Sequence, residues 1–240
     1  MTERLDKIIS SRTSLSRKEV ISEIRRGNVS VDGKVIRDNS AKFDAAISVI
    51  TLLGNPIEQN EHIYIMQNKP LGVVSASEGE KEKNVIDILP PELYRKSLFP
   101  AGRLDKASTG FVLITNDGDL AHRILSPKNH VEKEYIVCVD GFITNEVIDG
   151  FKAGLVLKSG EQFKCAKITV TYASPDKSSA VVVIREGKYH QIRRMFAKFG
   201  LTVTALHRVR IGGLSLDADL ALGQSKRLTD EEVQKLQKQD

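Results

Sequence analysis

The sequence of 240 residues predicts an α+β protein, with a small helix-and-hairpin domain ahead of a larger domain built on a mixed, largely antiparallel sheet. The spacing of the elements supports this fold class. Residues 1–45 carry helix-like and hairpin patterns, residues 46–61 are irregular, and residues 62–240 hold many strand-like segments. Because few long helices separate those strands, antiparallel pairing is favoured over a doubly wound sheet. We therefore predict two domains joined by a linker at 46–61.

The first domain begins with helices and a hairpin. Residues 5–9 place three apolar side chains at helical spacing. Ser16 and Glu19 form the capping-box pattern that starts a second helix, and Gly27 supplies its C-terminal stop. The stretch 29–36 then reads Val-Ser-Val-Asp-Gly-Lys-Val-Ile, in which an Asp-Gly turn joins two short strand-like runs. This pattern predicts a tight hairpin.

The first domain is also basic. Residues 1–44 hold ten Lys or Arg against seven Asp or Glu. The cations at the ends of the second helix, off its apolar stripe, are Arg17, Lys18, Arg25 and Arg26. Most such clusters are a solvated helix face. Charge alone therefore assigns no function to this domain.

A resemblance gives these cations a role. The segments 4–7, 15–17, 27–29 and 31–33 resemble the small RNA-binding domain named after ribosomal protein S-four. In that family the second helix and the hairpin present basic side chains to RNA phosphates, and such contacts bring affinity and orientation rather than sequence reading. The resemblance implies an RNA-binding set of Arg4, Arg17, Lys18, Arg25 and Arg26.

The second domain shows strand patterns separated by short helical ones. We expect strands at 63–66, 72–75, 110–115, 134–139, 163–171, 180–184 and 202–211. We expect helices near 119–125, 145–153 and 189–199. This order contains no internal repeat and no low-complexity segment.

Composition and cysteine usage exclude several classes of protein. The apolar runs are far shorter than the roughly 20 residues that cross a bilayer, and residues 1–6 carry two acids, so we expect a cytoplasmic protein that contacts no membrane. Cys138 and Cys165 form no close-spaced pair, and we interpret both as buried free thiols. The five histidines lack ligand spacing, so no metal site is expected. The net charge of +5 is compatible with nucleic acid, among other partners.

Three segments of the second domain carry reactive residue types. Residues 102–110 read Gly-Arg-Leu-Asp-Lys-Ala-Ser-Thr-Gly, a glycine-bracketed loop that leads into an apolar strand. An isolated aspartate such as Asp105 in this kind of loop usually caps a turn. Residues 131–137 set Tyr135 in an alternating strand, and residues 186–195 pack basic side chains around one turn between a strand and a short helix.

In this order and spacing, the three segments resemble the pseudouridine synthases, and most of all the branch that acts on small-subunit ribosomal RNA. The resemblance covers nearly the whole chain and includes residues 206–213 and 216–220. It implies that Asp105 is the catalytic aspartate, that Tyr135 lies against the target base, and that Arg193 is the basic partner of Asp105.

The implied reaction explains these residue types. Converting uridine to pseudouridine breaks the N1–C1′ bond, turns the uracil and joins its C5 to the same sugar carbon. No redox step occurs, so no cofactor or metal is required. One carboxylate near C1′ is needed, which either attacks the sugar or removes a ribose proton. Arg193 opposes a rise in the pKa of that carboxylate and holds it in one rotamer, while Tyr135 offers a flat apolar face and a hydroxyl for proton handling at C5.

Further residues of these segments are expected to contact the substrate. Arg103 either fills the gap that a displaced base leaves or forms a structural salt bridge. His190 and Gln191 are expected to orient their loop by hydrogen bonds rather than to react. The predicted substrate-binding set is Arg103, Lys133, Lys188, His190 and Gln191.

Two alternative functions stay open at this point. A non-catalytic RNA-binding or ribosome-assembly protein needs basic residues but no isolated carboxylate, so Asp105 together with Arg193 argues against it, unless Arg193 is only a charge on a helix surface. A large-subunit rRNA pseudouridine synthase keeps the chemistry and changes the target, and residues 207–220 favour the small subunit instead. We expect a monomer whose partner is ribosomal RNA in a small-subunit assembly intermediate.

Overall fold

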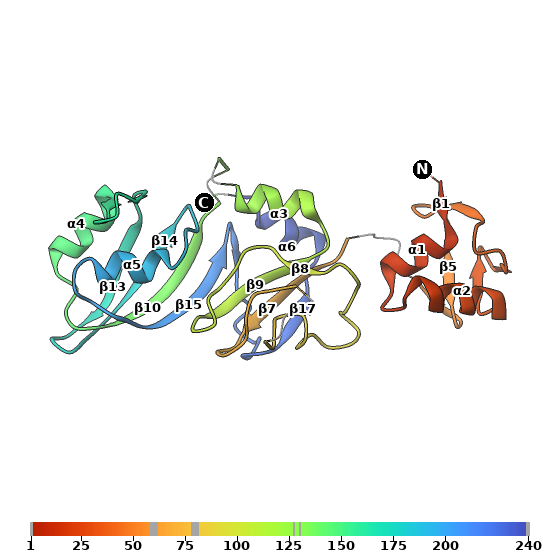
Figure 1. Cartoon of the computed structure of the whole chain (residues 1–240), viewed down its shortest axis with the longest axis horizontal. Helices are drawn as coiled ribbons and strands as arrows, with labels where there is room; N and C mark the ends of the chain where they lie inside the picture. Colours follow the sequence, from red (N-terminus) through yellow and green to blue (C-terminus); the bar gives the residue numbers. More distant parts are fainter. Residues whose placement is uncertain (1, 58–61, 78–81, 127, 130, 239–240) are drawn as a thin grey trace. The chain divides into compact units, whose positions relative to one another are not determined.

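The chain forms two compact units. The computed structural model describes residues 2–57, 62–77, 82–126, 128–129 and 131–238 (Figure 1). The first unit comprises Met1–Ile63 with Leu89–Leu98, and the second comprises Tyr64–Ile88 with Phe99–Asp240. Each unit has a buried hydrophobic core of its own.

Two short helices open the first unit as predicted, α1 (Leu5–Arg12) and α2 (Arg17–Arg26). The capping box that starts α2 is present. The Glu19 amide donates to Ser16 Oγ at 3.2 Å, and the Ser16 amide donates to Glu19 Oε2 at 2.6 Å. Gly27 ends the helix in the left-handed conformation, with a φ of 81°. The local sequence therefore sets both ends of α2.

The first unit also contains a four-stranded sheet of order β3-β2-β5-β6 and a separate pair of β1 with β4. The strands are β1 (Thr2–Arg4), β2 (Val29–Val31), β3 (Lys34–Val35), β4 (Lys42–Asp44), β5 (Ile50–Leu52) and β6 (Asn55–Pro56). The predicted hairpin is the antiparallel pair of β2 and β3, which turns at Asp32 and Gly33, both with positive φ. The core that these elements enclose is Leu5, Ile8, Ile9, Val20, Ile24, Val29, Val31, Ala45 and Ile50.

The predicted linker at 46–61 is wrong for residues 50–56, which belong to this sheet. β5 pairs with β2 in the register Val31↔Ile50, and Ile50 is buried. Strands of two or three residues are too short for an alternation to show in the sequence, so the segment had the pattern of a loop. Residues 58–61 of the predicted linker lie outside the described residues. The first unit therefore extends past the predicted boundary at residue 45.

A nine-stranded mixed sheet forms the frame of the second unit. Its order is β13-β14-β10-β15-β9-β7-β17, and in addition β16 pairs with β15 and β8 with β9. Its strands are β7 (Tyr64–Lys69), β8 (Phe99–Pro100), β9 (Thr109–Thr115), β10 (Lys133–Asp140), β13 (Lys167–Ala173), β14 (Lys177–Ile184), β15 (Val203–Ile211), β16 (Leu214–Ser215) and β17 (Ser225–Arg227). Every pair in it is antiparallel except β15 with β9. The predicted α+β class with a mixed, largely antiparallel sheet is confirmed.

Helices pack on both halves of this sheet. They are α3 (Gly118–Leu125), α4 (Asn145–Ala153), α5 (Gln191–Ala197) and α6 (Asp230–Lys235). Figure 1 shows α4 and α5 at the end of the sheet that holds β13 and β14, and α3 and α6 at the half that holds β8 and β9. The first three occupy predicted positions, although α5 is shorter than the predicted 189–199. Within the described part of the chain, no helix is long and apolar enough to cross a membrane.

Two strand predictions need correction. Within the described ranges, residues 72–75 make a single bridge, between Val74 and Asn84, and Gly72 turns the chain at a φ of 79°. The predicted strand at 163–171 is divided, since β12 (Gln162–Phe163) pairs with β11 (Leu155–Val156) and β13 begins only at Lys167.

The prediction that both thiols are buried is wrong for Cys165. Phe163 and Ala166 are the buried residues of that stretch, three positions apart, so the alternation of a strand is broken and Cys165 is exposed. Cys138, in β10, is half-buried. Both are free cysteines, as predicted.

The parallel contact of β9 with β15 depends on one glycine. Gly110 lies opposite Arg208 in the register and has a φ of 103°. A Cβ at this position would lie 2.3 Å from the carbonyl oxygen of Arg208, so no other residue fits without moving backbone. This close approach brings the loop at 102–110 beside β15.

Candidate active site

Asp105 lies in the loop between β8 and β9, and neighbouring backbone groups are held on both sides of it. The Leu104 amide donates to Ser75 Oγ at 3.0 Å, and the Ser75 hydroxyl donates back to the Leu104 carbonyl at 3.0 Å. On the other side, the Gly72 amide donates to the Lys106 carbonyl at 3.0 Å. The segment at 72–75 therefore acts as a brace for the Asp105 loop rather than as a sheet strand.

A buried lysine fixes the far end of the same loop. The ammonium of Lys69 donates to the Ser108 carbonyl at 2.7 Å and to the Pro70 carbonyl at 3.0 Å. Lys69 is fully buried. Burial lowers its pKa to about 8, the charge of Asp105 opposes this shift, and the charge of Arg208 adds to it. The sequence patterns did not single out Lys69.

Arg193 reaches Asp105 from α5. Its Nε lies 3.9 Å from Asp105 Oδ2. Its Nη2 donates to the Ala107 carbonyl at 2.9 Å and to the Ser108 hydroxyl at 3.4 Å, and its Nη1 donates to the Val203 carbonyl at 2.9 Å. One guanidinium therefore joins the Asp105 loop to β15, and Arg193 is not a solvated charge on a helix surface.

His190 approaches the other carboxylate oxygen. It is the N-terminal cap residue of α5 and adopts the left-handed conformation, with a φ of 49°. Its Nε2 lies 3.3 Å from Asp105 Oδ1, and its ring stacks on Tyr189 at a centroid distance of 3.9 Å. Asp105 keeps 32% of its side-chain surface exposed while these two partners flank it. A carboxylate held in one orientation and still open to solvent can meet a substrate.

The open side of Asp105 faces a pocket. Its polar lining consists of Arg103, Asp105, Ser108, Tyr135, Lys188, His190 and Gln191. Apolar side chains complete the wall, among them Ile184 and Leu206. The pocket therefore gathers most of the predicted catalytic and substrate-binding residues, while Arg193 contacts Asp105 beside it.

Hydrogen bonds arrange the loop that precedes α5. Gln191 Nε2 donates to Glu186 Oε1 at 2.8 Å, and the Lys188 amide donates to Gln191 Oε1 at 3.2 Å. Glu186 also accepts from the Lys164 amide at 2.8 Å. Gln191 thus orients its loop, as expected. The Lys188 ammonium donates to the Gln162 carbonyl.

Arg103 and Lys133 differ from each other in placement. Arg103 is exposed at the pocket and has no carboxylate partner among the described residues, so a structural salt bridge is not seen there. Lys133 is buried, and its ammonium donates to the carbonyls of Val131 at 3.0 Å and Ile124 at 3.4 Å. Burial lowers its pKa to about 8. Lys133 does not line the pocket, so the structure gives no support to the predicted substrate contact.

Arg208 is a site residue that sequence reasoning missed. It is 3% exposed, and its guanidinium lies 5.9 Å from the centroid of the Tyr135 ring. Its Nη1 lies 3.4 Å from the Tyr135 hydroxyl and its Nε donates to the Phe111 carbonyl at 2.6 Å. Its Nη2 is buried without a partner in the described residues. A buried cation without a carboxylate favours any negative charge that forms near it.

The predicted RNA-binding cations of the first unit divide into paired and unpaired ones. Arg4 and Arg17 lie 2.8 Å and 3.1 Å from the carboxylate of Asp6, which is fully buried. Burial disfavours the charge of Asp6, but hydrogen bonds from Arg4, Arg17 and Asn39 outweigh it and lower its pKa to about 2. Arg4 and Arg17 therefore have a structural role in holding the buried carboxylate of Asp6, in addition to any contact with RNA.

Residues of α2 line a shallow concavity. Its basic lining is Arg17, Lys18, Arg25 and Arg26. Arg26 pairs with Glu23 at 2.8 Å. Lys18 and Arg25 have no carboxylate partner within the part of the chain that the structure describes, and they lie seven positions apart on one helix face. These two cations are the ones available to an external anion.

Comparison with known proteins places this geometry in a family. Residues 63–198 match the family model of RNA pseudouridylate synthases. The uncharacterized RNA pseudouridine synthase YtzG of Bacillus subtilis is 42% identical over 230 residues, which cover 96% of each protein. Ribosomal small subunit pseudouridine synthase A of Escherichia coli is 39% identical over 236 residues, covering 96% of this chain and 98% of the relative. A crystal structure of a pseudouridylate synthase superposes with a TM-score of 0.67 at 33% identity, over 97% and 99% of the two chains.

Proposed function

The chain belongs to the RNA pseudouridylate synthase family, and on that premise we propose that it isomerises a specific uridine of small-subunit ribosomal RNA to pseudouridine, with Asp105 as its catalytic carboxylate. The observation that carries the role of Asp105 is its position: a partly exposed carboxylate, flanked by Arg193 and His190, in the lining of a pocket that also contains Tyr135. The full-length match to the E. coli relative, whose name specifies the small subunit, supports the choice of substrate.

The pocket suits a uridine that has left its stack. Such a base must be extruded before a protein can reach its sugar, which costs a few kcal/mol of stacking and pairing. Tyr135 then presents a ring face to the uracil, and Asp105 stands near C1′. The carboxylate either adds to C1′ or removes a ribose proton, and in both routes the N1–C1′ bond breaks. After the uracil turns, C5 bonds to C1′. In the first route this bond displaces the carboxylate from C1′, and in the second the carboxyl group returns the proton to the ribose. C5 then loses its proton and N1 gains one.

Fixed cations favour the step in which the base separates. Electrons of the N1–C1′ bond leave with the uracil, so negative charge develops on the ring. Arg208 is buried behind Tyr135, and Lys69 is buried beneath the Asp105 loop. Preorganised charges of this kind stabilise a transition state without having to reorganise during the reaction.

Side chains are sufficient for this isomerisation. No electrons pass to or from an external acceptor, so the reaction consumes no cofactor. Arg193 donates to the backbone of the loop that carries Asp105, and so holds the carboxylate in one position relative to a bound uridine. The proposed division of labour is therefore a reacting carboxylate at Asp105, a base-contacting ring at Tyr135, and positioning cations at Arg193 and Arg208.

The proposal extends to how the enzyme meets its RNA. The first unit acts as an affinity module through Lys18 and Arg25, whose charges are free for phosphates. The substrate is an assembly intermediate, because an incompletely folded RNA releases a base more readily than a finished subunit does. We further propose that the enzyme acts as a monomer and in the cytoplasm.

The experiment that tests this function maps pseudouridines in total ribosomal RNA. Cells that lack the gene are compared with the same cells complemented by the wild-type gene or by the Asp105→Asn variant. The expected result is one small-subunit pseudouridine that only the wild-type gene restores. Loss of a large-subunit site instead would reassign the substrate, and restoration by Asp105→Asn would exclude the proposed chemistry.

A further inference from the structure

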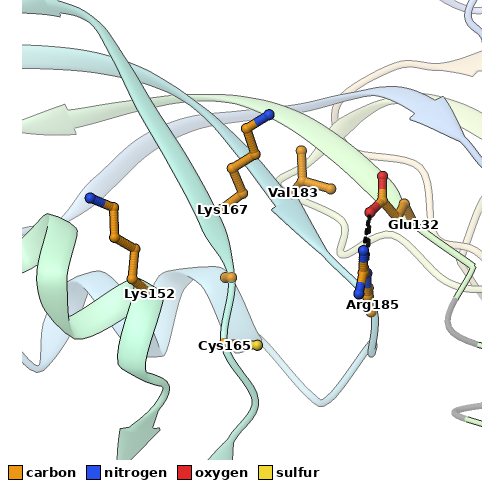
Figure 2. Close-up of a pocket in the computed structure, with 7 residues that line it drawn as sticks. Glu132, Lys152, Cys165, Lys167, Val183 and Arg185 are labelled. Atoms are coloured by element: carbon orange, nitrogen blue, oxygen red, sulfur yellow. Dashed lines mark hydrogen bonds and ion pairs between the residues drawn. The ribbon is translucent and has the colours of Figure 1, made fainter. Parts of the chain in front are cut away.

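A second pocket of the catalytic unit lies apart from Asp105 (Figure 2). It encloses about 330 Å³ and is lined by Glu132, Lys152, Cys165, Ala166, Lys167, Val183 and Arg185. Figure 2 shows Lys152 on one side, the Glu132–Arg185 pair on the other, and Lys167 between them. A concavity of this size falls within the range of small-ligand sites.

The rim of this pocket carries positive charge that the protein does not neutralise. Glu132 is the one acid among the described lining residues, and it is already paired with Arg185 at 3.0 Å and Arg210 at 3.2 Å. Among the described residues, the ammonium of Lys152 has one carboxylate partner, the exposed Asp149 at 4.0 Å, and a pair this long contributes little. Lys167 has no carboxylate partner within the described ranges. The rim therefore attracts an anion.

The floor of the pocket is apolar. Val183 is half-buried and Ala166 is buried, and the thiol of Cys165 lies beside them. An apolar floor under a cationic rim suits a ligand with a flat hydrophobic part and a charged part. A nucleotide has both, because its base presents an apolar face and its phosphodiester carries one negative charge.

The chain connects this pocket directly to the Asp105 pocket. Val183 and Ile184 are neighbours on β14 and point to opposite faces of the sheet, the first into this pocket and the second into that of Asp105. Just beyond, Arg185 lines this pocket and Gly187 lines the other. The two linings therefore meet, along the chain, at the turn that follows β14. A strand of RNA that occupies both pockets passes around this turn from one face of the sheet to the other.

From these contacts we infer that Lys152, Lys167 and Arg185 form a subsite for an unpaired nucleotide that flanks the target uridine. The rim binds its phosphodiester and the floor receives its base. This inference rests on the proposed function, since it deepens the way in which the same enzyme holds its RNA. The subsite contributes to the affinity for RNA and to the direction in which the RNA strand is bound. It takes no part in the bond-breaking step.

Cys165 supplies a direct readout of occupancy. Its thiol is exposed inside the pocket, whereas Cys138 is half-buried on another part of the sheet. The alkylation rate of each thiol by iodoacetamide is measured by peptide mass spectrometry, with and without saturating transcript of the host small-subunit rRNA. RNA is expected to slow alkylation of Cys165 several-fold and to leave Cys138 nearly unchanged. Equal rates for Cys165 with and without RNA would overturn the inference.

A charge variant tests the rim. Lys152→Ala with Lys167→Ala removes two cations and leaves Arg185, whose pairing with Glu132 supports the turn at 185–187. The control, Lys158→Ala with Lys177→Ala, removes two exposed lysines of the same unit that do not line the pocket. The salt dependence of RNA binding is measured as the slope of log K against log salt concentration. The loss of two phosphate contacts to a single strand should reduce the magnitude of this slope by about 1.4.

The outcomes separate this inference from the proposed function. The subsite is contradicted if the rim variant and the control variant lose the same amount of slope, or if neither loses any. This holds even if the enzyme still forms pseudouridine. Failure of the wild-type enzyme to form pseudouridine would contradict the proposed function whatever the binding data show. The subsite is supported when the rim variant alone loses slope and Cys165 is shielded.

Discussion

The guanidinium of Arg193 lies 3.9 Å from the carboxylate of Asp105 and donates to the Ala107 carbonyl in the same loop at 2.9 Å. The contact with the charged group is thus longer than the contact with the backbone. Arg193 restrains Asp105 mainly by fixing the loop that carries it, and the planar fork of the guanidinium is what makes both contacts possible.

Arg193→Lys therefore tests positioning. Lysine keeps the charge and loses the fork that also reaches Val203. A misplacement of the carboxylate by about 1 Å should lower the single-turnover rate by up to about 100-fold. RNA affinity, measured on the same variant by filter binding, should stay close to that of the wild type. A rate that also stays close to wild type would show that the fork is dispensable.

Arg208 and Tyr135 are predicted to act as one unit. Arg208→Met removes the buried cation beside the Tyr135 hydroxyl and should lower the single-turnover rate by about 100-fold, a typical loss for one preorganised electrostatic group. The same change made in a Tyr135→Phe background should cost much less, because the partner is already altered. Arg208→Lys keeps a positive charge and should restore part of the rate.

The control for this cycle is folding, because Arg208 also donates to the Phe111 carbonyl. Urea unfolding of each variant shows whether the second unit remains stable under assay conditions. Strictly additive rate losses in folded variants would mean that Arg208 and Tyr135 act independently.

The first unit should show an acid transition that depends on Asp6. Its pKa is about 2 in the folded protein, below the ordinary value of 3.8, so its contribution is fully present above pH 3.8 and is lost as pH falls towards 2. That shift corresponds to about 2 kcal/mol. Hydrogen exchange of residues 5–26 should show protection falling across this window in the wild type. In the Asp6→Asn variant these residues should be less protected at neutral pH and should lose less protection on acidification. An identical pH profile of protection in both proteins would show that Asp6 is not the cause.

The RNA affinity of the first unit should depend on Lys18 and Arg25. Both lack a carboxylate partner in the described ranges, whereas Arg17 holds Asp6, so mutation of Arg17 would mix binding with folding. Lys18→Ala with Arg25→Ala should weaken RNA binding and reduce its salt slope by about 1.4 to 1.8. The saturated single-turnover rate should change little, because phosphate contacts are the same in the ground and transition states. An unchanged affinity would show that α2 does not face the RNA.

Local sequence patterns predicted those elements that depend on neighbouring residues. The capping box of Ser16 and Glu19, the stop at Gly27, and the hairpin at Asp32 and Gly33 are all formed. Each depends on hydrogen bonds or φ angles within a few residues, so the information is contained in a short stretch. β5 was missed because a strand of three residues is defined by its partner β2, which lies far along the chain.

The site was predicted less completely, for a similar reason. Asp105, Tyr135 and Arg193 were singled out by resemblance, and the structure brings them together. Lys133 lies on the same face of β10 as Tyr135, but its ammonium donates to the Ile124 carbonyl of α3. The alternation of a strand does not predict such a contact. In the same way, alternation along β15 does not reveal that Arg208 is buried beside a tyrosine.

The most direct test of Asp105 as the catalytic carboxylate is the single-turnover yield of pseudouridine with Asp105→Asn. The substitution keeps the shape of the side chain beside His190 and Arg193 and removes its charge. The yield is measured on a small-subunit rRNA transcript that the wild-type enzyme converts fully, at enzyme concentrations that saturate binding of both proteins. We expect no detectable pseudouridine from a variant that folds and binds RNA like the wild type. Turnover above a few per cent of the wild-type rate would contradict the assignment of Asp105 as the catalytic carboxylate.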